Sequence, residues 1–195
     1  MEFVITFDEQ KLLLSQAREV ITAVLEKRKP VFNSIKDETK GKFNAFPTLD
    51  KECGVFVSLH MRPEHRLRGC IGRIHANLPL IETVRLMARE AAFGDPRFPP
   101  LETEELPQLQ IEISALSPMS LCYDPREIKI GVHGIYLVKG GRSGVFLPQV
   151  PVEQGWNLDE YLDYICVKAG LPSGSYEAPS AQLYTFTAIV FSEER

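Results

Sequence analysis

The sequence has no run of apolar residues close to the roughly 18 to 20 that a helix needs to span a bilayer. It also lacks a basic surplus, because 22 lysines and arginines stand against 26 aspartates and glutamates, for a formal net charge of −4. Dedicated binders of nucleic acid or anionic membranes usually carry such a surplus. The first residues, MEFVITFDEQ, lack the basic and apolar stretches of a signal peptide. We therefore expect a soluble cytoplasmic protein without membrane segments, for which nucleic acid is a disfavoured partner.

Cysteine and histidine are both sparse. Each occurs four times: Cys53, Cys70, Cys122 and Cys166, and His60, His65, His75 and His133. The cysteines form no CxxC pair and are too few for a disulfide scaffold, and the histidines form no HExxH pair. Isolated thiols fit a reducing compartment. We therefore predict no metal site, and the sequence indicates no particular cofactor.

The residues that are present describe an ordinary globular chain. Of its 195 residues, 44% are hydrophobic and 25% are charged, with no bias toward disorder. This length suits one well-packed domain, or one domain with a small appended lobe. We predict a single domain over residues 1–195, which allows for two lobes within that domain.

Apolar spacing and capping residues predict three helices. Thr6 and Glu9 have the form of a capping box, which begins the first helix, and Asn157 can cap the third. The helices are expected over residues 8–28, from about 80 to 94, and over 158–169.

Stretches rich in β-branched and aromatic residues predict the strands. They cover residues 53–60, 66–74, 109–117 and 183–191, with one or two further hairpins within 126–147. The first two strands form a hairpin across the turn MRPEH, and residues 31–52 read as a long connection with one short strand or edge segment. Helices interspersed with hairpins predict an α+β fold with a mixed, largely antiparallel sheet flanked by helices.

One stretch, HRLRGCIGRIHA (65–76), has the composition of neither a buried strand nor a surface turn. Strand alternation would place Arg68, Cys70 and Gly72 on one face, with the guanidinium beside the thiol. A neighbouring arginine favours the nucleophilic thiolate, and strand glycines allow a backbone or a ligand to approach closely. The alternative is an inert cysteine packed in the core, which is the commoner use of a free thiol.

The charge of this hairpin also stands out from that of the whole chain. Between His60 and His75 there are four arginines and one acidic residue, Glu64. Such a hairpin could hold a phosphate or carboxylate group through an arginine fork. The alternative is a solvated surface whose charges have no specific partner.

Three other stretches carry polar residues near predicted turns. Asp95 and Arg97 follow a helix end, where they either pair to fix the turn or contribute to a site. His133 lies between two glycines, where a turn would present it as a general base or as an ordinary surface histidine. Gln149 and Glu153 lie in a segment expected to be non-helical, just before the third helix, and Glu153 would orient His133 or bind a cation.

Seven motifs together resemble the AMMECR domain family, whose prokaryotic members are called AmmeMemoRadiSam system protein A. They are GVFVSL (54–59), LRGCIGRI (67–74), AAFGDPRFPPL (91–101), EELPQLQIEISALSP (104–118), GVHGIYL (131–137), GVFLPQVPVEQGW (144–156) and YICVKAGLP (164–172). The resemblance covers about residues 10–191. It departs from the family pattern at Arg73, where a small polar residue is expected after the LRGCIG hexapeptide.

The resemblance implies an α+β fold with a main sheet, a smaller lobe and a cleft between them that the hexapeptide faces. It implies that one site is formed by Arg68, Cys70, Asp95, Arg97, His133 and Glu153. Similar proteins are associated with a Memo-type protein and a radical-SAM enzyme, which implies a shared pathway. The family has no established activity.

Three functions are compatible with this site, and whether the protein is an enzyme stays open. We favour a module that binds a small anionic or modified ligand, or a modified peptide, in a cleft lined by Arg68, Gly69, Gly72, Asp95, Arg97 and Gln149. The second is a cysteine-dependent enzyme in which Cys70 is the nucleophile, His133 the base and Glu153 the residue that orients it. RNA binding is a weaker third, and a homodimer is compatible with the sequence.

Overall fold

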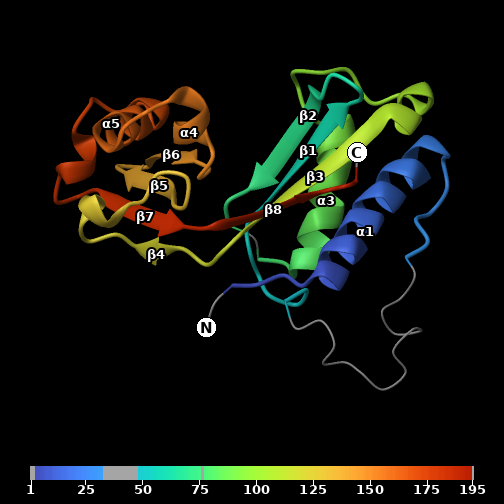
Figure 1. The fold of residues 1–195 in the computed structure, drawn as a ribbon, viewed down its shortest axis with the longest axis horizontal. Helices are drawn as coiled ribbons and strands as arrows, with labels where there is room; N and C mark the ends of the chain where they lie inside the picture. Colours follow the sequence, from blue (N-terminus) through green and yellow to red (C-terminus); the bar gives the residue numbers. More distant parts are fainter. Residues whose placement is uncertain (1–2, 33–47, 76, 195) are drawn as a thin grey trace. The chain divides into compact units, whose positions relative to one another are not determined.

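Two compact units make up the computed structural model, which describes residues 3–32, 48–75 and 77–194 (Figure 1). The first unit contains residues 1–116 and 189–195, and the second contains residues 117–188. The chain therefore leaves the first unit once and returns to it once. None of the helices in the described ranges is long and apolar enough to cross a membrane.

The first unit is built on a four-stranded sheet in the order β2-β1-β3-β8. Its strands are β1 (Val55–Met61), β2 (Arg66–Arg73), β3 (Leu109–Leu116) and β8 (Ala188–Ser192). Strand β1 pairs antiparallel with both β2 and β3. The helices α1 (Phe7–Leu25) and α3 (Leu80–Phe93) pack against each other and against the sheet, and a 3-10 helix, η1 (Thr103–Gln108), precedes β3.

Alternation along β1 separates the two faces of this sheet. Val55, Val57 and Leu59 are fully buried and belong to the core that α1 and α3 cover, whereas the residues between them are half-buried. Helix α1 begins at the capping box that the sequence predicts, with the Thr6 hydroxyl and the Glu9 carboxylate each accepting a backbone N–H. The sequence thus specifies which faces form this core.

Strand β2 contains a β-bulge. Leu59 pairs with Gly69, but His60 pairs with Leu67, so that Arg68 has no partner on β1. An extra residue of this kind interrupts the alternation of the strand. Arg68 and Gly69 are accordingly both buried, which a regular strand does not predict.

The second unit has its own sheet, in the order β4-β7-β5-β6, and its own core. Its strands are β4 (Ser120–Leu121), β5 (Gly134–Lys139), β6 (Arg142–Phe146) and β7 (Gln182–Phe186). Its helices are α4 (Val150–Gln154) and α5 (Leu158–Lys168), with the 3-10 helices η2 (Pro125–Glu127) and η3 (Ser175–Glu177). Tyr161 and Ile165 of α5 are fully buried beside Ile135 and Leu137 of β5.

The α+β class with largely antiparallel sheets flanked by helices is confirmed. Two element predictions are wrong. The strand expected over 183–191 is divided into β7 and β8, which belong to different sheets, because Thr187 leaves the ladder to bond with Ser117. The segment before the third helix, expected to be non-helical, contains α4. The short strand expected within 31–52 falls largely outside the described residues.

Candidate functional site

Cys70 lies on the face of the first sheet opposite α1 and α3. It pairs with Ser58 of β1, which in turn pairs with Glu112 of β3, so these three residues occupy adjoining positions across three strands. The Ser58 hydroxyl donates a hydrogen bond to the Cys70 sulfur over 3.2 Å. Cys70 is half-buried, so its thiol is neither sealed in the core nor fully open to solvent.

The backbone of Cys70 is held by the turn that follows α3. Its N–H donates to Oδ2 of Asp95 over 2.8 Å, and its carbonyl accepts a hydrogen bond from Nη2 of Arg97 over 3.1 Å. Strand β2 is an edge strand, whose outward backbone groups have no neighbouring strand. Asp95 and Arg97 therefore satisfy the backbone N–H and carbonyl of Cys70, which a neighbouring strand would otherwise bind.

Asp95 and Arg97 also bind each other. Nε of Arg97 donates to Oδ1 of Asp95 over 3.0 Å and Nη2 donates to Oδ2 over 2.7 Å, which is a bidentate pair. The hydrogen bonds from Arg97, together with the N–H of Cys70, hold the pKa of Asp95 far below its usual range. The same pairing raises the pKa of Arg97, with a smaller contribution from Cys70. The Asp95 side chain is buried, whereas that of Arg97 is 56% exposed.

Arg68 does not lie as the strand alternation predicts. Nε and Nη2 donate to the two carboxylate oxygens of Glu105 over 2.6 and 2.9 Å, and the guanidinium also donates to the carbonyls of Pro99 and Pro100. Its side chain is only 6% exposed. The predicted placement of the Arg68 guanidinium beside the thiol of Cys70 is therefore wrong, because the bulge turns Arg68 out of register. The hydrogen bond from Arg68 lowers the pKa of Glu105.

The two glycines beside Cys70 are required by packing. A Cβ on Gly69 would lie 2.1 Å from the carbonyl oxygen of Ala91, so this glycine lets α3 approach the strand. A Cβ on Gly72 would lie 2.2 Å from the ring of Phe56 on the neighbouring strand. The close approach expected at these glycines is thus made by the protein itself, and their role in ligand binding stays a prediction.

The other predicted site residues belong to the second unit. His133 lies just before β5, where Nδ1 accepts the N–H of Lys129 over 3.3 Å and its carbonyl accepts the hydroxyl of Tyr161 over 3.2 Å. Gln149 precedes α4, and Glu153 lies exposed within it. In the part of the chain that the structure describes, no hydrogen bond or ion pair joins His133 to Glu153. Their membership in one site with Cys70 stays a prediction.

Metal-binding residues do not cluster in residues 3–32, 48–75 or 77–194, where no group of three or more His, Cys, Asp and Glu side chains is arranged to hold an ion. The arrangement around Cys70 instead offers hydrogen-bond donors, from Ser58 and Arg97, beside a half-buried sulfur. Such a setting suits recognition of a negative group.

Two residues of this site were not predicted from the sequence. Ser58 carried a partial signal, because it is a polar residue of the strand predicted to pair with 66–74, although direct pairing across the turn MRPEH would place Phe56 opposite Cys70. Glu105 carried no such signal, since its contact with Arg68 joins positions 37 residues apart and depends on the bulge.

Comparisons with known proteins agree with this architecture. An uncharacterised protein of Pyrococcus horikoshii, PH0010, has a crystal structure that superposes with a TM-score of 0.83 at 38% identity, covering 98% of this chain and 95% of that one. Protein MK0488 of Methanopyrus kandleri is 41% identical over 97% of this chain and 91% of its own length. Protein MJ0810 of Methanocaldococcus jannaschii is 38% identical over 97% and 92%. The AMMECR1 family model matches residues 14–191, and the chain therefore belongs to the AMMECR1 family.

Proposed function

We propose that the protein binds a small anionic ligand, or a peptide carrying an anionic modification, at Arg97 and Cys70. The carboxylate or phosphate group of the ligand takes hydrogen bonds from Arg97, and the thiol of Cys70 contacts the adjoining atoms. Gly69 and Gly72 shape the strand that carries the thiol. Asp95 positions Arg97 for this contact.

The observation that carries the proposal is the way Arg97 is held. Asp95 fixes one side of the guanidinium through Nε and Nη2, and more than half of the side chain is exposed. Among the hydrogen bonds of the described residues, none uses Nη1 of Arg97. An arginine whose geometry is already fixed loses less conformational entropy when an anion binds.

A pair of alkylating reagents tests the proposal directly. Iodoacetate and iodoacetamide modify the same sulfur but differ in charge, so the ratio of their rates at Cys70 reports attraction of an anion independently of thiol reactivity. We expect Arg97→Gln to lower the ratio of iodoacetate to iodoacetamide at least threefold, measured by mass spectrometry of the Cys70 peptide at low ionic strength.

Arg89→Gln is the matched control, because Arg89 is an exposed arginine of α3 whose ion-pair contact is long, at 3.8 Å. Its ratio should equal that of the unmodified protein. An equal fall in both variants, or no fall in Arg97→Gln, would rule out an anion site at Arg97.

A cysteine-dependent enzyme is the second candidate, and the hydrogen bond from the Ser58 hydroxyl to the Cys70 sulfur favours it. A donor at this position orients the sulfur, which is the nucleophile of that mechanism. In that mechanism His133 is the base and Glu153 orients it. Cys70→Ser distinguishes the two functions, since a binding site keeps most of its affinity whereas nucleophilic turnover is lost.

The family resemblance implies one further part of the proposal, namely that the ligand or modified partner belongs to a pathway shared with a Memo-type protein and a radical-SAM enzyme. Isolated thiols, which fit a reducing compartment, support action in the cytoplasm. Co-purification of these proteins from cells, compared with cells that carry the Arg97→Gln variant, would link the pathway to the site.

A further inference from the structure

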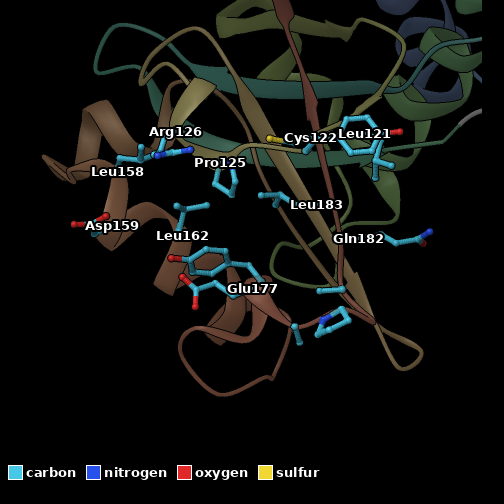
Figure 2. Close-up of a pocket in the computed structure, with 15 residues that line it drawn as sticks. Leu121, Cys122, Pro125, Arg126, Leu158, Asp159, Leu162, Glu177, Gln182 and Leu183 are labelled. Carbon is cyan, nitrogen blue, oxygen red and sulfur yellow. The ribbon is translucent and has the colours of Figure 1, made fainter.

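A pocket lies entirely within the second unit, far along the sequence from the hexapeptide. It has a volume of about 820 Å³ and is bounded by β4, β7, α5 and η3 (Figure 2). Leu162 and Leu183, both buried, contribute apolar surface, and Pro125 adds to it. A volume of this size lies within the range of known small-molecule sites.

The charged residues that line this pocket are two acids and one base. Asp159, in the first turn of α5, and Glu177, at the end of η3, both line it. The arginine that lines the pocket, Arg126, is paired with Asp124, to which it donates from Nε over 2.9 Å and from Nη2 over 2.8 Å. Within the described ranges, neither Asp159 nor Glu177 forms a salt bridge. The pocket therefore presents two carboxylates without a cation of their own.

An aromatic ring lies among these carboxylates. Burial raises the pKa of Tyr176, and the negative charges of Glu177, Asp163 and Asp159 raise it further, so its hydroxyl stays neutral at physiological pH. The face of an aromatic ring attracts a cation and does not attract an anion. Tyr176 and the two lining carboxylates thus favour the same sign of charge in a ligand.

We propose that this pocket binds an organic cation, namely a protonated amine or a guanidinium carried on an apolar stem. The carboxylate of Glu177 accepts a hydrogen bond from the cationic head, the ring of Tyr176 lies beside it, and the negative charge of Asp159 adds to the attraction. The stem packs on Leu162 and Leu183. Desolvating the head is offset by these contacts, and an anion of the same size would face two uncompensated negative charges.

Two sources supply this chemistry, a free amine and the basic side chain of a peptide. Phenethylamine represents the first and N-acetyl-lysine methylamide the second, while 2-phenylethanol is the uncharged counterpart of phenethylamine. Each is titrated into the full-length protein, and binding is followed by the chemical shifts of backbone amides. Binding of either amine at residues 121–126 and 176–183 supports the proposal, and the tighter of the two identifies the source.

Charge recognition is tested by the double variant Asp159→Asn/Glu177→Gln. We expect phenethylamine to bind the unmodified protein at least fivefold more tightly than 2-phenylethanol, and we expect the double variant to lose this preference. Glu104→Gln, which removes an exposed carboxylate of the first unit, is the matched control and should keep it.

A second variant keeps the test valid if the double variant does not fold. Ala178→Phe fills part of the pocket without changing its charge, and it should weaken phenethylamine binding at least fivefold. The proposal is overturned if phenethylamine and 2-phenylethanol bind equally well, or if neither binds at the pocket. It is also overturned if the folded variants bind phenethylamine as tightly as the unmodified protein.

Discussion

Asp95 acts on Cys70 through the backbone, because its carboxylate accepts the N–H of Cys70 while its other oxygen binds Arg97. A buried carboxylate that accepts several charge-assisted hydrogen bonds is strongly favoured in its ionised form. The conformation of the strand at the hexapeptide is consequently tied to the charge state of a residue 25 positions further along the chain.

This link predicts a specific dependence of stability on pH. Asp95→Asn should reduce the free energy of unfolding by about 2 kcal/mol at pH 7, the range for hydrogen bonds to charged groups. The pKa of Asp95 is lowered in the folded state, so its contribution is complete above its unfolded pKa of about 3.9 and is lost as the pH falls further. Urea unfolding at pH 7, 5 and 3 measures this difference.

The difference between Asp95→Asn and the unmodified protein should be the same at pH 7 and 5 and smaller at pH 3. If the difference in the free energy of unfolding is the same at all three pH values, the ionised carboxylate of Asp95 does not stabilise the fold through its charge.

The residue scale also shows what the sequence could and could not predict. The pairing of Asp95 with Arg97 was one of two readings of the GDPR turn, and it follows from their short separation. The burial of Arg68 was not predictable, because it needs both the bulge and Glu105. Strict alternation along the strand places Arg68 on the same face as the thiol of Cys70. The unpaired residue of the bulge reverses the faces of the strand residues that precede it, so this placement fails.

At the scale of elements, the hexapeptide strand is shaped by its contact with α3. Gly69 allows the carbonyl of Ala91 to approach, and a Cβ at Gly69 would also lie 3.8 Å from the side chain of Leu59. Gly72 instead lies below the ring of Phe56, which is half-buried on the opposite face of the sheet. A side chain added at Gly69 would therefore clash with a fixed backbone, whereas one added at Gly72 would clash with a side chain that can rotate.

These obstacles predict different costs for the same substitution. Gly69→Ala should lower the free energy of unfolding by about 2 to 3 kcal/mol or prevent folding, because a helix backbone must shift to admit the new methyl group. Gly72→Ala should cost clearly less, because Phe56 can turn away. Thermal and urea unfolding of both variants give the comparison, and equal losses would contradict the role assigned to Ala91.

Most elements were predictable because their signals are local. The capping box of α1, the hairpin of β1 and β2 and the cap of α5 each depend on residues a few positions apart. The division of 183–191 into β7 and β8 could not be predicted from the sequence, because both halves have the same composition, rich in strand-forming residues. The bonds between Thr187 and Ser117, 70 residues apart, mark the break.

At the scale of the whole molecule, the second unit is a single continuous stretch with its own sheet and core. The first unit is assembled from two stretches, since β8 joins β3 from the other end of the chain. Glu193 strengthens this join by accepting hydrogen bonds from Arg18 of α1 and from the N–H of Ile111.

This organisation predicts that residues 117–188 fold without the rest of the chain. The isolated segment should give dispersed amide resonances and a cooperative urea transition, although a unit this small has only marginal stability. A segment without β8, residues 1–116 alone, is the counterpart and should lack a cooperative transition. A disordered spectrum for 117–188 would show that its core depends on the first unit.

The return of the chain at residue 189 also sets an order of events during synthesis. The ribosome delivers residues 1–116 first, yet their sheet cannot acquire its fourth strand until the whole of 117–188 has been translated. The β3 edge therefore stays open for the duration of that translation, and an open edge invites mispairing with other nascent chains. Early folding of the inserted segment would shorten the search that brings β8 back to its neighbour.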